Sequence, residues 1–220
     1  MRKDVQLLLG VFLTVICVPA RADRPVFGNN PGNGNAFNLA FESGNTFGGA
    51  VLFTPQENID VSSVTLWLNN YNGQNGISPS VAIYDSYQIS GNTYALAAEI
   101  ANLNTPPPND GSMAAFNFSA PAETMLEAGQ AYWLFAYGFW GGGPGFGAAC
   151  YWNAGGSLSG DAVYDQADYF NNGGLAGLSS VVPAFALNTV PEPGYGTLLT
   201  IPALFWLARL LKNRCRERGK

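Results

Sequence analysis

Short runs of hydrophobic residues, separated by turn-forming residues, recur along the middle of the chain. In Val64–Leu68 and Ala115–Phe118 hydrophobic and polar side chains alternate, so every second residue of an extended strand would face a core. Gly, Asn, Pro and Ser bound the runs, as they bound strands in all-β proteins. This pattern predicts about ten strands: Ala36–Phe41, Phe47–Phe53, Val61–Asn69, Ser80–Tyr87, Tyr94–Leu103, Met113–Phe118, Ala131–Phe139, Ala148–Trp152, Ala162–Tyr169 and Val181–Leu187.

An all-β fold, an antiparallel β-sandwich of jelly-roll type, is the simplest architecture for these strands. The alanines of Thr93–Leu103 leave a helix open as an alternative in that segment. Met125–Gln130 predicts a tight connection into a buried central strand, in which Tyr132 and Trp133 point to opposite faces. The Gly/Asn-rich stretch Gly28–Asn35 predicts a flexible leader.

The composition narrows the chemistry that the chain can perform. Of its 220 residues, 47% are hydrophobic and only 11% charged, and none is histidine. The absence of histidine excludes Ser-His-Asp and Cys-His nucleophile pairs, a histidine general base, and zinc or haem sites that need histidine. We therefore expect a protein that is not an enzyme and that needs no cofactor.

The charges are unevenly distributed along the chain. Nine of the ten basic residues lie near the two ends, whereas residues 23–190 hold Arg24 and twelve carboxylates, a net charge of −11. So acidic a region does not attract nucleic acid, and we expect no nucleic-acid partner. Basic ends around an acidic middle are typical of targeting segments that flank an exported domain.

Residues 1–22 have the three parts of a secretory signal peptide. Met1–Lys3 supplies a basic start, and Leu7–Val18 is an apolar stretch too short to be a comfortable membrane span. Ala20 and Ala22 form the small-x-small pattern that signal peptidase recognises, so we expect cleavage between Ala22 and Asp23. A retained N-terminal anchor is the alternative.

The segment 190–220 combines three features in a fixed order. Pro191, Glu192 and Pro193 precede an apolar stretch, 195–211, which is followed by a basic tail, 212–220. The two prolines keep the motif extended and outside any following helix. As a helix the apolar stretch would span roughly 26 Å, short of the ~30 Å hydrocarbon core, so it predicts a single, marginal transmembrane helix. The basic tail would stay in the cytoplasm and leave the acidic domain across the inner membrane.

This order of motif, apolar helix and basic tail resembles the PEP-CTERM sorting signal. The resemblance implies that an exosortase, a membrane-embedded enzyme similar to a cysteine transpeptidase, processes the chain at or next to Pro191–Pro193, which are then substrate residues. It also implies a transient anchor in the inner membrane of a Gram-negative bacterium. The expected destination is the cell surface or the exopolysaccharide matrix. An ordinary tail anchor is the alternative.

The central region has a resemblance of its own. Val64–Leu68, Val81–Asp85, Phe116–Phe118 and Leu126–Leu134 together resemble the choice-of-anchor R domain of bacterial surface proteins. That domain occurs with several kinds of surface anchor and has no established catalytic activity. The shared residues are mostly strand residues, so the resemblance implies a fold and export.

These features predict three parts: a signal peptide (1–22), an exported β-sandwich domain (23–189) and a sorting signal (190–220). We expect a structural or interaction component of the cell surface or biofilm matrix, with the exosortase, the inner membrane and exopolysaccharide as partners. The alternatives are a carbohydrate-binding module and a hydrolase of matrix polysaccharide. No pair of carboxylates stands out for the hydrolase, which would need two of them flanking a sugar.

Aromatic residues gather around the glycine-rich loop 141–145. Trp140, Phe146 and Trp152 are candidate contacts to a polysaccharide, because exposed rings stack on sugars and a glycine-rich loop permits close approach. Packing in the core is the alternative for these aromatic residues.

Asp161, Asp165 and Asp168 form a candidate calcium site, since calcium takes oxygen ligands. Their spacing matches no EF-hand, a solvated acidic face is the alternative, and we expect no metal. Cys150 is the one cysteine between the two predicted targeting segments, so it has no partner for a disulfide within that domain. We expect a small buried residue, and a reactive thiol is the alternative.

Overall fold

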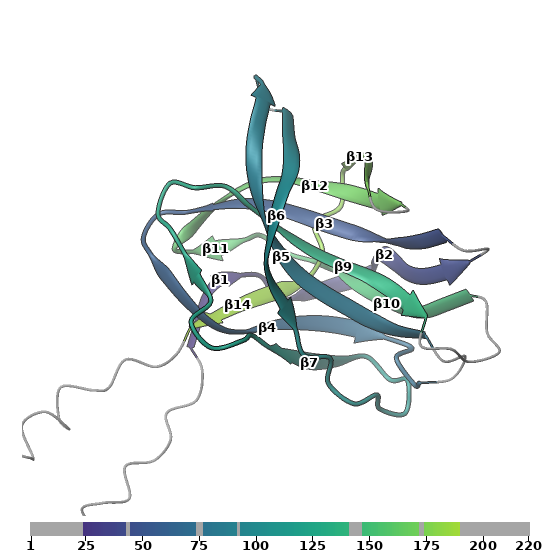
Figure 1. Ribbon diagram of the computed structural model, residues 1–220. Helices are drawn as coiled ribbons and strands as arrows, with labels where there is room; N and C mark the ends of the chain where they lie inside the picture. The colour runs from purple at the N-terminus through teal and green to yellow at the C-terminus, as the bar shows by residue number, and fades with distance from the viewer. Residues whose placement is uncertain are drawn as a thin grey trace, which may run out of the picture. The chain divides into compact units, whose positions relative to one another are not determined.

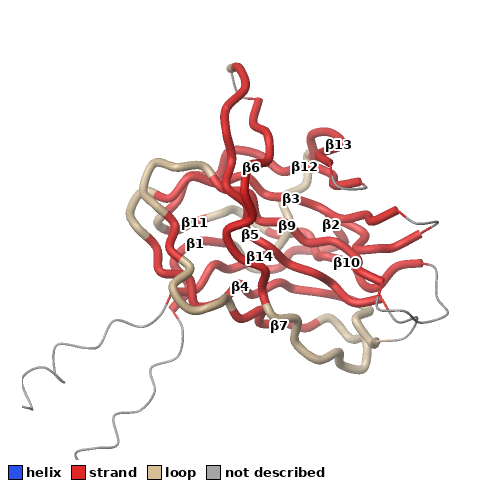
Figure 2. The backbone as a smooth tube through the Cα atoms, in the orientation of Figure 1, coloured by secondary structure: helices blue, strands red, loops and turns tan. Residues whose placement is uncertain are grey.

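The computed structural model describes residues 24–42, 45–73, 77–91, 93–140, 147–171 and 174–189, which contain strands and no helix (Figure 1, Figure 2). The all-β class is therefore confirmed. The predicted signal peptide and the predicted sorting signal lie outside these ranges. Within them, no helix is long and apolar enough to cross a membrane.

The described residues form fourteen strands. Their bounds are β1 Arg24–Gly28, β2 Pro31–Glu42, β3 Asn45–Pro55, β4 Ile59–Asn69, β5 Ile77–Ser90, β6 Thr93–Leu103, β7 Ala114–Ser119, β8 Met125–Leu126, β9 Tyr132–Trp140, β10 Gly147–Gly155, β11 Ser159–Gly160, β12 Ala162–Asn171, β13 Gly174–Ser179 and β14 Phe185–Thr189.

Each predicted strand overlaps a strand of the structure, although the ends differ by a few residues. The segment Thr93–Leu103 is β6, so the helix alternative is wrong there. Cross-strand hydrogen bonds to β5 override the helix preference of its alanines. The last predicted strand begins late, at Phe185, because Pro183 makes only an isolated bridge with Ala154.

The stretch Gly28–Asn35 is not a flexible leader, contrary to the prediction. β1 ends at Gly28, β2 begins at Pro31, and Asn29 between them is only 7% exposed. The backbone N–H of Asn29 donates to the carbonyl of Phe185 at 2.9 Å. Bonds to residues far along the chain thus order a segment whose composition is typical of a loop.

The strands pair antiparallel in the order β11-β1-β14-β4-β10-β2-β3-β9-β5-β6. β12 lies beside β3 and β13 beside β12, while β7 and β8 pair with β4. β10 pairs with both β2 and β4, so it links the half of the order from β11 to β4 with the half from β2 to β6 in one sheet.

The main core receives side chains from two parts of this sheet. β4 contributes Val64, Leu66 and Leu68, the alternating residues that were predicted to face a core. The rings of Phe27 in β1 and Phe53 in β3 are 5.6 Å apart in the same core. The sheet therefore folds so that the part containing β1, β14, β4 and β7 packs against the part containing β12, β3, β9 and β5 (Figure 1).

A second, smaller core lies on the opposite face of β3 and β9. It contains Leu52 of β3, Trp133 and Phe135 of β9, and Phe170 of β12. Tyr132 belongs to the main core, so Tyr132 and Trp133 do point to opposite faces, as predicted. β9 is thus a central strand that is buried on both sides.

Candidate functional site

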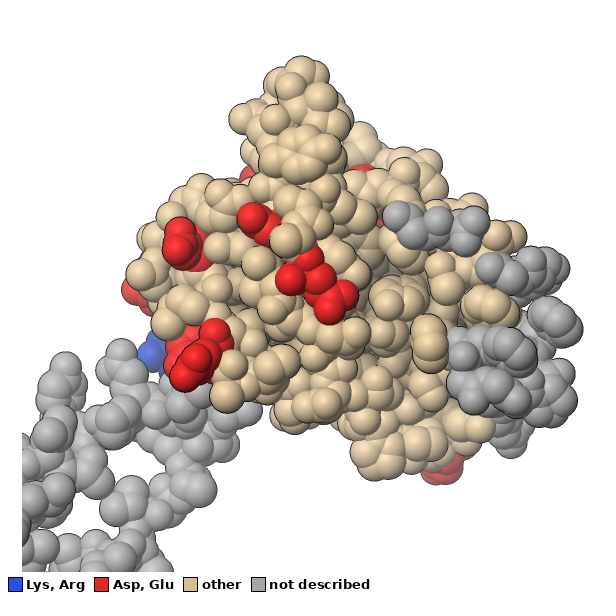
Figure 3. All heavy atoms as spheres, viewed as in Figure 1, with Lys and Arg blue, Asp and Glu red and all other residues tan. Residues whose placement is uncertain are grey.

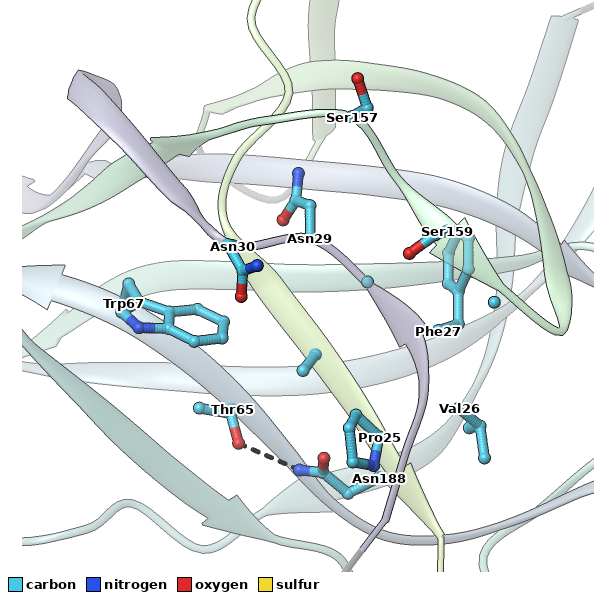
Figure 4. A pocket seen from close by; sticks show the side chains of 13 residues that line it. Pro25, Val26, Phe27, Asn29, Asn30, Thr65, Trp67, Ser157, Ser159 and Asn188 are labelled. Carbon is cyan, nitrogen blue, oxygen red and sulfur yellow. Dashed lines mark hydrogen bonds between the residues drawn. The ribbon is translucent and has the colours of Figure 1, made fainter.

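A groove of about 490 Å³ is lined by residues of β1, β4, β11 and β14 and of the loops beside them (Figure 4). Its volume falls within the roughly 300–1,000 Å³ that is usual for small-molecule sites. Eight of its lining residues have polar or aromatic side chains: Phe27, Asn29, Asn30, Thr65, Trp67, Ser157, Ser159 and Asn188.

Trp67 reaches the groove because alternation along β4 turns it away from the core. Leu66 and Leu68 on either side are fully buried in the main core, whereas Trp67 is half-buried. The backbone N–H of Trp67 donates to the carbonyl of Ala184 at 3.4 Å, which ties this end of β4 to the start of β14. The indole Nε1–H makes no hydrogen bond within the described ranges and can donate to a ligand.

Asn29 fixes the end of the groove where three chain segments meet. Its Nδ2 donates to the carbonyl of Gly156 at 3.0 Å, and the N–H of Phe185 donates to its Oδ1 at 3.0 Å. The preceding Gly28 has φ +150°, and a Cβ there would lie 2.1 Å from the carbonyl oxygen of Phe185. Only glycine allows β1 to approach β14 this closely, so the wall of the groove follows from the Gly28–Asn29 pair.

A chain of side-chain hydrogen bonds crosses the floor of the groove. Asn188 Nδ2 donates to Thr65 Oγ1 at 3.0 Å and to Ser63 Oγ at 3.1 Å. Thr65 Oγ1 in turn donates to Asn117 Oδ1 at 3.3 Å. These bonds hold the Asn188 amide in one orientation and leave its Oδ1 without a partner in the described part of the chain, so this oxygen can accept from a ligand (Figure 4).

Three further polar side chains along the groove have no side-chain hydrogen bond to the described residues. They are the amide of Asn30 and the hydroxyls of Ser157 and Ser159, and all three residues are exposed. In Figure 4 Asn30 lies next to Trp67, and the two serines lie across the groove from them. The groove therefore offers amide and hydroxyl groups together with one aromatic ring at its edge.

The lining of the groove is uncharged. None of its thirteen residues is Asp, Glu, Lys or Arg. Arg24 is the one basic residue in the described ranges, and carboxylates are spread over the face shown in Figure 3. An anion would therefore find no cation among the lining residues, although Arg24 adjoins Pro25 in the sequence and pairs with Thr189 across the β1–β14 ladder.

The structure corrects one of the predicted aromatic contacts. Trp152 is fully buried in the main core, and its Nε1–H donates to the carbonyl of Ala184 at 2.7 Å. A buried ring cannot stack on a polysaccharide, so the core alternative holds for Trp152. Phe146 lies outside the described residues, and for Trp140 the structure describes only the backbone, at the end of β9.

The three aspartates of the calcium hypothesis do not assemble a site. Within the described ranges no group of three Asp, Glu, Cys or His residues could hold a metal ion. A β-bulge between Tyr164 and Gln166 changes the register around Asp165, whose Oδ2 instead accepts from Thr54 Oγ1 at 2.8 Å. Asp168 is buried and accepts from Gln166 Nε2 at 3.3 Å. Burial raises the pKa of the Asp168 carboxyl above the ordinary value of 3.8, and partial desolvation raises the pKa of the more exposed Asp165 as well.

Cys150 is buried and free, as expected. Burial raises the pKa of its thiol far above the ordinary value, so Cys150 has no thiolate character at neutral pH. The predicted processing residues Ala20, Ala22, Asp23, Pro191, Glu192 and Pro193 lie outside the described residues.

No protein-family model matches this chain, and no curated protein matches it either. The groove itself was not among the predicted sites. The alternation of Val64–Leu68 already placed Trp67 on the face away from the core, and this was the available signal. No sequence pattern indicated that Asn29 and Asn30 line a groove, because their Gly/Asn-rich surroundings predict a loop.

Proposed function

We propose that this chain is exported, processed by an exosortase, and retained at the cell surface or in the exopolysaccharide matrix as a structural or interaction component. The signal peptide expected at 1–22 and the PEP-CTERM-like segment at 190–220 support this proposal. The exported domain is proposed to be a jelly-roll-like β-sandwich. The shared core of the two parts of the sheet supports that architecture.

The observation that carries the proposal is the pairing of the first and last strands. Arg24 and Thr189 are cross-strand partners in the β1–β14 ladder, so the domain begins and ends at neighbouring positions (Figure 1). A domain closed by its own terminal strands does not need residues 1–22 or 190–220 for its sheet. Removal of both segments would therefore leave the sheet intact, as export followed by processing requires.

The groove favours a binding role over the hydrolase alternative. Glycoside hydrolysis in most enzyme families needs two carboxylates on opposite sides of the scissile bond. The lining of this groove contains amides, hydroxyls and a tryptophan but no carboxylate. We therefore propose non-catalytic interaction as the role of the domain at the surface.

The test is intact mass and cell fractionation in the native host. The wild-type chain is compared with a variant in which Pro191, Glu192 and Pro193 are all alanine. The control variant replaces Pro107 and Pro108, two exposed prolines of the domain, by alanine. The wild type and the control are expected to lose the C-terminal tail and to leave the inner membrane, while the triple variant stays full length and membrane-bound. Retention of the tail by the wild type in the inner membrane would overturn the proposal.

A further inference from the structure

We infer that the groove beside Trp67 binds a short segment of a neutral polysaccharide. The inference rests on the proposed function only for the source of the ligand, an extracellular polysaccharide. The ligand class follows from the lining of the groove itself.

The aromatic component of the site is the half-buried ring of Trp67. An indole presents a flat apolar face and a single N–H donor, and a pyranose ring presents an apolar face of C–H groups and a rim of hydroxyls. The unpaired Nε1–H of Trp67 can donate to a sugar hydroxyl while its ring packs against the C–H face. One aromatic ring with several hydrogen-bonding groups in the same groove provides both kinds of contact that such an amphipathic sugar ring can make.

The hydrogen-bonding groups match hydroxyls rather than ions. The amide of Asn30 and the hydroxyls of Ser157 and Ser159 can each donate and accept, and Asn188 Oδ1 can accept. A sugar hydroxyl also donates and accepts, so every one of these groups can pair with it. A phosphate or carboxylate accepts only and would leave the Asn188 oxygen facing another acceptor.

The uncharged lining of the groove favours neutral sugars over acidic ones. The groove has no Lys or Arg to pair with a uronate, and residues 23–190 have a net charge of −11. Bringing an acidic sugar into this groove would cost its solvation with no counter-charge among the lining residues, since Arg24 adjoins Pro25 but does not line the groove. The same lining has no carboxylate for a metal ion, which leaves an uncharged ligand.

The site is preorganised by bonds that do not involve a ligand. Asn29 fixes the end of β1 against Phe185 and Gly156, and Ser63 and Thr65 hold the amide of Asn188. Side chains that are already ordered lose little entropy when a ligand binds. Of the proposed ligand-binding groups, the Asn188 amide is thus the one whose orientation the fold already fixes.

The test measures binding of defined hexasaccharides to the purified full chain in a detergent without a sugar headgroup. The probes are cellohexaose, laminarihexaose and mannohexaose, with hexagalacturonate as the anionic comparison, and binding is measured by calorimetry. We expect at least one neutral probe to bind more tightly than about 1 mM and to be recovered intact, while hexagalacturonate does not bind. Because the full chain is used, failure of sorting in the host would not affect this result.

Four variants locate the site. Trp67→Ala is expected to weaken binding at least about tenfold, and Asn30→Ala about three- to fivefold. Trp67→Phe keeps a stacking face but loses the Nε1–H donor, so it should bind more weakly than the wild type and more tightly than Trp67→Ala, which separates loss of the ring from loss of folding. Tyr87→Ala removes an aromatic residue that is 55% exposed and does not line the groove, so it should bind like the wild type.

Several results would overturn the inference. They are the absence of binding by all three neutral probes at millimolar concentration, unchanged affinity in folded Trp67→Ala, and preferential binding of hexagalacturonate. Loss of binding in Trp140→Ala but not in Trp67→Ala would assign the ligand to the aromatic cluster predicted from the sequence instead. Cleavage of a probe would replace the binding role by hydrolysis.

Discussion

The ring of Phe37 occupies the space that a side chain at Gly49 would need, since a Cβ at Gly49 would lie 2.1 Å from Cδ2 of Phe37. Phe37 in β2 also packs against Trp152 in β10, at 5.9 Å between ring centroids, and edge-on against Tyr169 in β12, at 5.3 Å. The glycine in β3 thus allows one aromatic ring to connect three other strands.

Replacement of Gly49 by alanine should destabilise the fold. The added methyl group would overlap a ring that is fixed by two other aromatic residues, so we expect a loss of about 1–3 kcal/mol in the free energy of unfolding. Urea unfolding monitored by tryptophan fluorescence gives this value. Gly32→Ala is the control, because a Cβ there meets its nearest atom at an ordinary 3.4 Å, and it should change stability by less than about 0.5 kcal/mol. Equal stability of the two variants would contradict this account of Phe37.

The strands with clear alternation could be predicted from the sequence. Val64, Leu66 and Leu68 face the main core as expected, and so do Phe116 and Phe118 of β7. In these segments the local pattern and the tertiary packing favour the same structure.

The segment Gly28–Asn35 shows why the rest could not be predicted. Its composition favours a loop, yet Asn29 is bonded to Phe185, 156 positions away in the sequence. Local patterns contain no information about such a partner. The same limit applies to the site. Trp152 is buried because of the register between β10 and β2, and the exposure of Trp67 also depends on how the strands pair. Neither pairing can be read from the local sequence pattern.

Asn29→Ala should lower stability by about 1–3 kcal/mol, because the N–H of Phe185 and the carbonyl of Gly156 would both lose their partner. Asn30→Ala is the neighbouring control. Asn30 is exposed and its side chain makes no hydrogen bond within the described ranges, so the change should stay within about 0.5 kcal/mol. Chemical denaturation of both variants tests the difference. If Asn29→Ala were as stable as Asn30→Ala, the bridge would not hold β1 against β14.

Trp152 should behave as a core residue rather than as a ligand contact. Trp152→Ala is expected to cost about 3–5 kcal/mol, since it would open a cavity in the main core. Trp152→Phe keeps most of the ring but removes the N–H that donates to Ala184, so its cost should be smaller, about 1–3 kcal/mol. Thermal unfolding ranks the two. Folded Trp152→Phe should bind the neutral hexasaccharide as the wild type does, and a selective loss of binding at unchanged stability would restore Trp152 as a contact residue.

Asp168 should make stability depend on pH in a direction that is unusual for a carboxylate. It is 5% exposed, its Oδ1 is buried without a partner in the described residues, and burial raises the pKa of its carboxyl above the ordinary value of 3.8. Between the ordinary pKa and the raised one the folded protein holds a proton that the unfolded chain has lost. The stability that this proton supplies is therefore complete below the ordinary pKa and is lost as the pH rises through the pKa of the folded state.

Asp168→Asn should consequently be more stable than the wild type at pH 7, because a neutral amide can accept from Gln166 without burying a charge. The difference should shrink as the pH falls below about 4, where the wild-type carboxyl is protonated in both states. Asp110→Asn is the control, because the pH dependence of the stability that Asp110 contributes has the opposite direction. Hydrogen bonds from Ser112 lower the pKa of Asp110, so its contribution is present above the ordinary value and is lost on acidification. Melting temperatures of the three proteins from pH 3 to pH 8 test both directions. A wild type more stable than Asp168→Asn at pH 7 would mean that the carboxylate is stabilised by a partner and that burial does not dominate.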